Sequence, residues 1–204
     1  LRGTKIPEQD MKSQSMAAPV KIIAAGPVLF YHIAMAISCS YFSYESPVGV
    51  LFVASDGYGV TDLAIGVKES DFIRGVASRH AGAPAFDSGR FPSLIKALDE
   101  YFLGNPVSFD VPLNPSGSAF DRLVWSALSA IPWGMALSYG ELAEAIGKPG
   151  AARAVGGACG RNPIPVIIPC HRVLQAGGSL GGYSGGEGIK EKLLILEGIA
   201  FKGR

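Results

Sequence analysis

The stretch SYGELAEAIGKPGAARAVGGACGRNPIPVIIPCHRV, residues 138–173, decides how the second half of the chain is organised. It opens with Ser138-x-x-Glu141, the pattern of a capping box, which predicts a short helix that runs to Gly147. The letters GKPG then predict a tight turn, and residues 151–160 predict a second helix. Two helices joined by such a turn are typical of a helix-turn-helix, although an ordinary helical hairpin has the same pattern.

The second predicted helix carries small side chains almost throughout, with Arg153 as its charged residue. A helix with small side chains can approach another surface closely, and a lone arginine is hard to place if that surface is another helix. In a DNA groove, the arginine could reach the groove floor or the base stack. The pattern therefore favours a DNA-binding helix with Ala151, Ala152, Arg153 and Gly156 against the nucleic acid.

The segment after this helix places a cysteine beside a histidine. Asn162 precedes Pro163, which favours a turn, and the apolar run 166–168 is expected to hold Cys170 on a rigid segment. A thiolate is a nucleophile, and a nearby imidazole can lower the pKa of a thiol or remove its proton. Neighbours on an extended segment point to opposite sides, so we expect His171 to act through a water molecule or a bend. The alternative is a buried apolar cysteine beside a structural histidine.

Two further features follow towards the C-terminus. The loop GGYSGG, residues 181–186, lets a ligand approach backbone amides closely, and Tyr183 and Ser184 add an aromatic face and a donor. In the last predicted helix, Glu197 shares the apolar stripe. A buried carboxylate needs a partner, and His171 is a candidate; otherwise Glu197 ends the helix in solvent.

The first half of the chain has a different pattern. The apolar runs 48–54 and 60–66 flank an Asp-Gly turn and predict a β-hairpin, with a further strand before it. Residues 69–80 and 91–104 predict helices. The proline-rich stretch 105–118 is predicted to be a linker.

We therefore predict an α+β protein with a small N-terminal sheet-and-helix domain and a mainly helical C-terminal domain that contains the helix-turn-helix. The expected bounds are 1–34 for a leader or extension of unknown role, 35–111 for the N-terminal domain and 112–204 for the C-terminal domain. The C-terminal domain has a second capping-box pattern, Ser118-x-x-Asp121, ahead of a helix.

The composition narrows the classes of protein to which the chain can belong. The 204 residues carry a net charge of +1, with a slight basic excess in the second half that weakly indicates an anionic partner. Three scattered cysteines argue against a disulfide framework and a closed four-ligand zinc site. The uncharged stretch 22–44 is long enough to cross a bilayer, but Gly26-Pro27 and several polar residues interrupt it. We expect no membrane association and a location in the cytoplasm, or in the nucleus of a eukaryote.

The chain closely resembles the methylated-DNA–protein-cysteine methyltransferases, also called O6-alkylguanine-DNA alkyltransferases. The resemblance lies in three motifs and in their order along the chain: SYGELAEAIGKPGAARAVGGACGRNPIPVIIPCHRV, GGYSGG and LLILEG. The resemblance spans about 118–198 and continues more loosely through the first half. It implies a ribonuclease H-like N-terminal domain and DNA repair by direct reversal. The alkyl group of O6-alkylguanine, and also of O4-alkylthymine, would pass irreversibly to the protein after the base is flipped out. The expected partner is double-stranded DNA that bears the lesion, bound by a monomer with cooperativity left open, and no cofactor is expected.

The resemblance also implies a catalytic role for four residues. Cys170 would accept the alkyl group, while a water molecule, His171 and Glu197 relay its proton. Asn162 would brace the segment between the recognition helix and the nucleophile.

Further roles concern the DNA and the base. Arg153 would fill the gap that the extruded base leaves, and Tyr139 would press on the phosphate and help to rotate the nucleotide. The Ser184 amide would face the guanine O6, and the carbonyls of Cys170 and Val173 would accept from the exocyclic amine. The expected pocket residues are Tyr139, Cys159, Val173, Tyr183 and Ser184.

One departure from the family and three alternative functions accompany the resemblance. Some relatives bind zinc through two cysteines and two histidines, but here Cys39 is followed by Asp56 and Thr61 at expected ligand positions, so we expect no metal. A non-catalytic lesion sensor of the same fold would lack the thiol of Cys170. A cysteine hydrolase would want a helix start after the cysteine, which HRVLQAGG does not predict. A transcription factor would leave the thiol, the glycine-rich loop and Glu197 unexplained.

Overall fold

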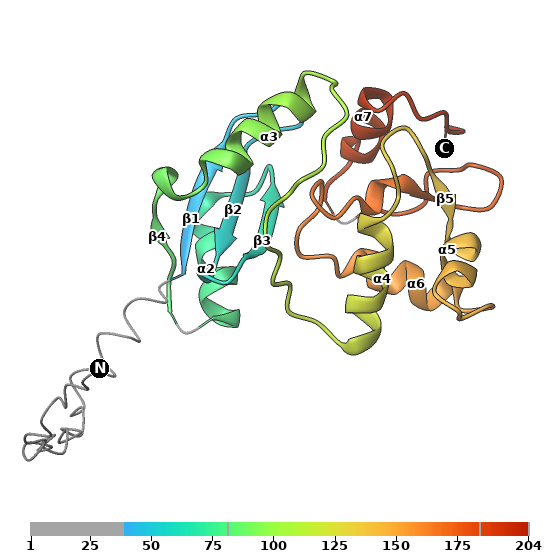
Figure 1. The fold of residues 1–204 in the computed structure, drawn as a ribbon, viewed down its shortest axis with the longest axis horizontal. Helices are drawn as coiled ribbons and strands as arrows, with labels where there is room; N and C mark the ends of the chain where they lie inside the picture. The colour runs from blue at the N-terminus through green and yellow to red at the C-terminus, as the bar shows by residue number, and fades with distance from the viewer. Residues whose placement is uncertain (1–38, 81, 184, 204) are drawn as a thin grey trace, which may run out of the picture.

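The computed structural model describes residues 39–80, 82–183 and 185–203. The expected leader, residues 1–34, lies outside these ranges, as does most of the uncharged stretch 22–44. Figure 1 shows two parts side by side, a sheet with its helices and a cluster of helices, which confirms the predicted α+β class. Within the described ranges, no helix is both long and apolar enough to cross a bilayer.

The N-terminal part is built on a four-stranded sheet with the strand order β3-β2-β1-β4. The predicted hairpin forms as an antiparallel pair in which Val53 lies opposite Leu63. A parallel edge strand and a short 3-10 turn, which the sequence did not predict, precede the second helix. The elements are β1 (Ser40–Tyr44), β2 (Leu51–Ser55), β3 (Val60–Ile65), β4 (Ala85–Phe86) and η1 (Ser88–Arg90).

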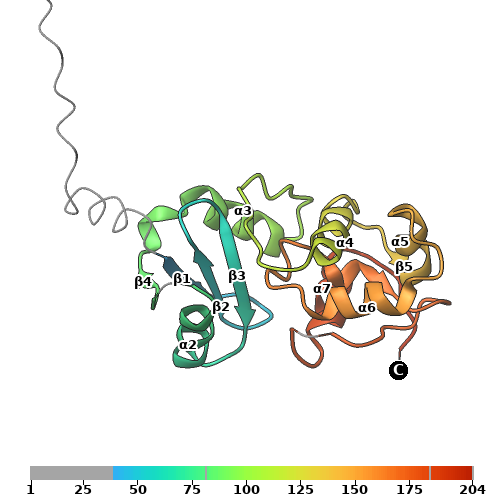
Figure 2. The same ribbon diagram turned by 90° about the horizontal axis from the view of Figure 1, so that it is seen from below.

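The two helices of this part cover opposite faces of the sheet (Figure 2). Helix α2 (Glu69–Arg79) packs on the face that carries Tyr41 and Phe52. Helix α3 (Pro92–Phe102) packs on the other face, which carries Phe42. Because side chains alternate along a strand and both faces are covered, β2 is buried along its whole length.

The predicted linker is bound to the edge of the sheet. The Val60 amide donates to the Pro112 carbonyl and the Asn114 amide donates to the Val60 carbonyl, both over 2.8 Å. Gly59 permits this approach, since a Cβ atom there would lie 2.6 Å from the Pro112 oxygen. The Asn114 side chain also donates to Asp56 over 2.7 Å, so the linker has a fixed path past the hairpin.

The C-terminal part contains four helices in its described residues, and both predicted capping boxes form. The Ser118 hydroxyl accepts from the Asp121 amide, and the Ser138 hydroxyl accepts from the Glu141 amide. In each box the carboxylate bonds back to the amide of the serine, so two exposed donors at the helix start are satisfied. The helices are α4 (Ala119–Ser129), α5 (Tyr139–Ala145), α6 (Ala152–Gly160) and α7 (Ile189–Leu196).

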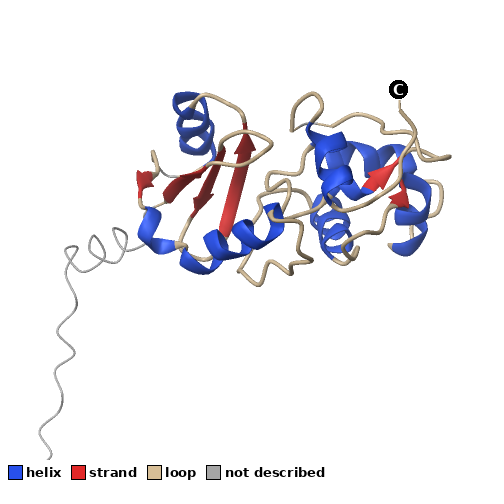
Figure 3. Cartoon of the chain, turned by 90° about the horizontal axis from the view of Figure 1, so that it is seen from above, coloured by secondary structure: helices blue, strands red, loops and turns tan. Residues whose placement is uncertain are grey.

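The predicted helix-turn-helix is formed by α5 and α6. Trp125 of α4 packs behind it and donates its indole N–H to the Ala158 carbonyl over 2.9 Å. A small parallel sheet, which the sequence did not predict, pairs β5 (Leu137–Ser138) with β6 (Val173–Leu174) among the helices (Figure 3). This pairing places the start of α5 beside the residues that follow Cys170.

The two parts of the molecule share one apolar core. Buried side chains of the sheet and α3 continue directly into those of α4, α6 and α7. At the junction the Leu63 amide of β3 donates to the Pro163 carbonyl over 2.7 Å. The edge of the N-terminal sheet therefore holds the chain segment that leads towards Cys170.

Candidate active site

The segment between α6 and Cys170 forms a buried bend held by one amide side chain. Asn162 Nδ2 donates to the Ile168 carbonyl over 2.8 Å and to Cys170 Sγ over 3.1 Å. Its Oδ1 accepts from the Ile164 amide over 3.0 Å. Within the bend, Val166 has a φ of 75°, which a β-branched residue rarely adopts. Asn162 thus fixes the bend and the thiol together.

Cys170 and His171 do not lie on an extended strand. They begin a 3-10 turn, η2 (Cys170–Arg172), and the Cys170 amide donates to the Ile168 carbonyl over 2.8 Å. The expected extended geometry is therefore wrong, because this short-range hydrogen bond turns the backbone at Pro169 and the 3-10 turn follows directly. Among the described residues, no hydrogen bond joins Cys170 Sγ directly to the imidazole.

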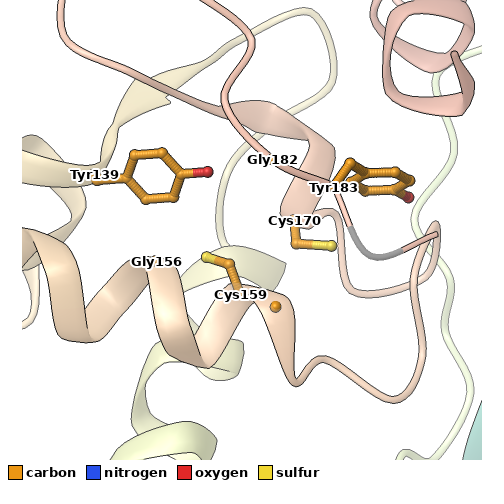
Figure 4. A pocket seen from close by; sticks show the side chains of 7 residues that line it. Tyr139, Gly156, Cys159, Cys170, Gly182 and Tyr183 are labelled. Atoms are coloured by element: carbon orange, nitrogen blue, oxygen red, sulfur yellow. The ribbon is translucent and has the colours of Figure 1, made fainter. Parts of the chain in front are cut away.

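Cys170 faces a pocket of about 360 Å³ between α6 and the glycine-rich loop (Figure 4). Cys170 is only 4% exposed to solvent. The wall opposite carries the Tyr139 ring and a second thiol, Cys159. The lining residues are Tyr139, Gly156, Cys159, Gly160, Cys170, Gly182 and Tyr183.

The surroundings keep both pocket thiols protonated at rest. Burial raises the pKa of Cys170, while the hydrogen bond from Asn162 and the charge of Lys190 act in the opposite direction. Burial raises the pKa of Cys159 to about 12, although the charge of Lys190 and a backbone hydrogen bond act in the opposite direction, and no side-chain donor is among the causes. Burial also raises the pKa of Tyr139 to about 12, so its hydroxyl stays neutral. Of the two thiols, Cys170 has the donors that stabilise a thiolate once its proton leaves.

A buried polar cluster lies directly behind Cys170. His171 Nε2 lies 2.8 Å from Glu197 Oε1, and both residues are buried. Arg172 donates to Glu197 through Nε over 2.7 Å and Nη2 over 3.0 Å, and through Nη1 to the Ile131 carbonyl over 2.6 Å. The pairing of His171 with Glu197 is confirmed. The alternative of Glu197 in solvent is wrong, because Glu197 is buried and its carboxylate is bonded by His171 and Arg172.

The fourth member of this cluster comes from the other part of the molecule. The Tyr101 hydroxyl of α3 donates to Glu197 Oε1 over 2.7 Å and lies 3.4 Å from His171 Nε2. Burial alone would raise the pKa of Glu197, but the hydrogen bonds from His171, Arg172 and Tyr101 lower it to about 2. The carboxylate is therefore ionised at neutral pH.

The ionised carboxylate determines which imidazole nitrogen carries the proton. Glu197 is an acceptor, so His171 presents Nε2–H to it and keeps Nδ1 unprotonated in the neutral form. Nδ1 is buried with no protein partner among the described residues. Burial lowers the pKa of His171, so the ring is neutral at rest and can accept one proton at Nδ1.

A buried lysine completes the charge around the thiol. Lys190 Nζ donates to the carbonyls of Val173 and Leu180, both over 2.6 Å. Burial lowers the pKa of Lys190, while the two pocket thiols act in the opposite direction. Its positive charge favours ionisation of Cys170.

The structure brings some of the expected residues to the pocket and leaves others outside. Tyr139, Cys159 and Tyr183 line it with Cys170. Val173 is fully buried and does not line it, although its carbonyl points to Lys190. Ser184 lies outside the described residues. The other expected DNA contacts, Ala151, Ala152 and the exposed Arg153, lie at the start of α6, away from the pocket lining.

Sequence reasoning missed Tyr101, Arg172 and Lys190. Tyr101 lies within the predicted helix 91–104, but nothing local indicated that it reaches a carboxylate 96 positions away. Lys190 gave a usable signal, since it precedes Leu193 and Leu194 by three and four residues and so lies on the buried face of its helix.

No group of three or more His, Cys, Asp and Glu side chains suited to a metal ion occurs within the described ranges. Two of the residues considered for zinc have other neighbours: Asp56 accepts from Asn114, and Thr61 is buried in β3. Residues 1–38 are not covered by this observation.

Comparison with known proteins connects this geometry to a chemistry. Residues 39–115 match the family model of the 6-O-methylguanine DNA methyltransferase, ribonuclease-like domain. Residues 119–199 match the model of the 6-O-methylguanine DNA methyltransferase, DNA binding domain. The expectation of a ribonuclease-like first domain is thus confirmed.

Individual relatives agree with the family models. The chain is 45% identical over 157 residues to the methylated-DNA–protein-cysteine methyltransferase of Mycobacterium tuberculosis, covering 77% of this chain and 91% of the relative. It is 43% identical over 159 residues to that of Methanosarcina acetivorans, covering 78% and 97%. The crystal structure of Mycobacterium tuberculosis OGT in complex with DNA superposes with a TM-score of 0.68 at 42% identity, covering 78% of this chain and 92% of that one. The chain therefore belongs to the O6-methylguanine-DNA methyltransferase family and is a DNA-binding methylated-DNA–protein-cysteine methyltransferase that repairs O6-alkylguanine.

Proposed function

We propose that Cys170 is the residue of this chain that accepts the alkyl group. The observation that carries the proposal is the position of its Sγ, which faces the pocket and accepts from Asn162. The next residue in the chain is His171, which is paired with Glu197. Cys159 lines the same pocket, but burial raises its pKa to about 12 without such a donor.

In the proposed step, the Sγ lone pair attacks the alkyl carbon in line with its bond to O6. The S–C bond forms, the C–O bond breaks, and its electron pair remains on the guanine. The thiol proton passes through a water molecule to His171 Nδ1, where Glu197 stabilises the imidazolium through Nε2. One proton then returns to the departing guanine, so that overall the thiol hydrogen and the alkyl group exchange places. Because a thioether C–S bond is chemically stable, each protein molecule would act once.

The proposed substrate is O6-alkylguanine within double-stranded DNA. The alkylated oxygen faces inward in a duplex, so the nucleotide must leave the stack before it can reach a thiol that is 4% exposed. Arg153, exposed on α6, would fill the gap in the stack, and the small residues Ala151, Ala152 and Gly156 would allow the helix to approach the groove closely.

The pocket suggests how the flipped base is held. Tyr139 would act at the phosphate and the pocket wall, and Tyr183 would stack on the base. Cys159, which lines the pocket, would lie beside the alkyl substituent. The Ser184 amide and the Cys170 carbonyl would bond the base edge, whereas the Val173 carbonyl already accepts from Lys190. We include O4-alkylthymine as a second, smaller substrate for the same pocket.

Further aspects of the proposal concern the whole molecule. We propose that the protein acts as a monomer on DNA, without a cofactor, in the cytoplasm or in the nucleus of a eukaryote. The three free cysteines suit a reducing compartment. We also propose that 35–111 and 112–204 are the two functional domains, with cooperative binding along DNA as a property to be measured.

The experiment is intact-mass analysis after incubation with a duplex that contains one O6-methylguanine, followed by peptide mapping. The expected result is one added methyl group on the Cys170 peptide, saturating at one per protein. Cys170→Ala should abolish transfer and retain lesion binding, whereas Cys159→Ala should retain transfer. Lesion binding without any mass change in the wild-type protein would instead identify a sensor.

A further inference from the structure

Tyr101 belongs to the N-terminal part of the molecule but ends among the catalytic candidates of the C-terminal part. It occupies the last turn of α3, it is fully buried, and its hydroxyl donates to Glu197 Oε1 over 2.7 Å. The same oxygen lies 3.4 Å from His171 Nε2. One hydroxyl therefore touches both members of the proposed proton relay.

Packing holds this hydroxyl in place. The Tyr101 ring contacts Phe102, Phe109 and Trp133 at centroid distances of 5.1, 5.5 and 5.2 Å. These neighbours come from α3, the linker and the segment after α4, so the ring is enclosed on several sides. An enclosed ring carries its hydroxyl to a fixed point at little cost in side-chain entropy.

The hydroxyl fills a defined place around Glu197. Oε2 accepts from Arg172 Nε, while Oε1 accepts from Arg172 Nη2 and Tyr101 and faces His171 Nε2. The groups that face this carboxylate are thus a guanidinium and an imidazole from η2 and a phenol from α3. The phenol is the member of this set that comes from outside the C-terminal part.

We propose that Tyr101 is a positioning residue for alkyl transfer. Its hydroxyl holds the Glu197 carboxylate and the His171 imidazole in fixed relative positions, so that the N-terminal domain supplies part of the active site. This inference rests on the proposed relay through His171 and Glu197. Burial and the Glu197 charge raise the pKa of Tyr101, so the hydroxyl keeps its proton and acts as a permanent donor.

The inference separates rate from binding. Tyr101 does not line the pocket, so its hydroxyl has no contact with DNA or base to lose. Removing it would leave Glu197 Oε1 with one donor fewer and allow the carboxylate and imidazole to shift. We expect the transfer rate at saturating DNA to fall by about tenfold or more, as is usual for loss of a hydrogen bond to a charged group.

The test compares Tyr101→Phe with a matched control, Tyr41→Phe. Tyr41 of β1 is also buried, donates to Glu69 over 2.8 Å on the sheet face that α2 covers, and does not line the pocket. For each protein, single-turnover transfer from duplex O6-methylguanine is measured against DNA concentration. The final extent of transfer gives the fraction of active molecules.

Support requires that Tyr101→Phe lowers the maximal rate about tenfold while half-saturation and final extent stay unchanged, and that Tyr41→Phe leaves all three unchanged. A wild-type maximal rate, or a loss confined to final extent or half-saturation, would overturn the inference. A second measurement uses Glu197→Gln: adding Tyr101→Phe to this variant should lower its maximal transfer rate little further. Failure of the proposed function is distinguishable, because it would leave the Cys170 peptide of the wild-type protein unmethylated.

Discussion

Asn162 Nδ2 lies 3.1 Å from Cys170 Sγ and 2.8 Å from the Ile168 carbonyl, so one side-chain amide holds both the thiol and the bend that presents it. The other end of the same amide accepts from the Ile164 amide. Asn162 therefore fixes the local backbone, and in the proposed step it would also supply a donor to the Cys170 thiolate that forms as the proton leaves.

Asn162→Ala is expected to slow alkyl transfer by roughly 10- to 100-fold, because hydrogen bonds to charged groups contribute about 1.5–3 kcal/mol. The measurement is the single-turnover rate on duplex O6-methylguanine. Asn105→Ala is the control, since Asn105 bonds to Glu100 at an exposed site. Equal rates for wild type and Asn162→Ala would contradict the proposed role of Asn162 as a donor to the thiolate.

Lys190→Met should lower both stability and thiol reactivity. The change leaves the buried carbonyls of Val173 and Leu180 without their donor, at about 1–3 kcal/mol for such unsatisfied groups. It also removes the positive charge that lowers the pKa of Cys170, so iodoacetamide should label Cys170 more slowly at a given pH. Lys192→Met, an exposed change on the same helix, should alter neither urea unfolding nor labelling.

Glu197 makes stability depend on acid pH in a defined window. Its pKa is held at about 2 in the folded protein against an ordinary value of 4.5. The ionised carboxylate therefore stabilises the fold above pH 4.5, and this contribution is lost as the pH falls from 4.5 towards 2. Burial lowers the pKa of His171 from its ordinary 6.5, so protonation of the unfolded chain begins to favour unfolding below that pH.

Urea midpoints of wild type and Glu197→Gln across this range provide the measurement. The difference between the two proteins should be constant above about pH 5 and shrink below pH 4.5. A difference that stays the same at pH 3 would mean that Glu197 is not held ionised by its neighbours.

Asp121→Asn should destabilise the C-terminal part by about 1–2 kcal/mol, as loss of a helix cap usually does. Asp121 accepts from the Ser118 amide and hydroxyl and from Arg161 Nε and Nη2, and Arg161 is the main cause of its lowered pKa. Arg161→Gln is the matched change, with a smaller expected loss of stability because the Arg161 side chain is 59% exposed and its ion pair is screened by solvent. Thermal unfolding of both variants would test this order, and a larger loss for Arg161→Gln would reverse it.

The features that were predicted from the sequence are those encoded by short patterns. The capping boxes at Ser118 and Ser138 need residues three positions apart, and both form as expected. The hairpin and the helix-turn-helix likewise follow from turn residues and from periodicity over one or two elements. Cys170, His171 and Glu197 were proposed from the sequence because two are adjacent and the third is a carboxylate on an apolar face, and their catalytic roles stay a prediction.

The features that were missed depend on contacts between distant segments. The β5–β6 pair joins two-residue strands 36 positions apart, too short to leave a pattern. Tyr101 reaches Glu197 through the packing of α3 on the C-terminal helices, which no local spacing encodes. The 3-10 turn at Cys170 follows a bend that the Asn162 side chain holds through the Ile168 carbonyl, and Asn162 lies before the prolines of this segment.

The burial of Cys170 has a consequence if, as proposed, this thiol accepts the alkyl group and each molecule acts once. A thiol that combined with any passing electrophile or oxidant would waste a whole polypeptide without repairing a base. Because Cys170 is 4% exposed and burial raises its pKa, the resting protein offers such reagents little access and little thiolate. Its inertness between encounters thus conserves the supply of unreacted protein for bases that enter the pocket.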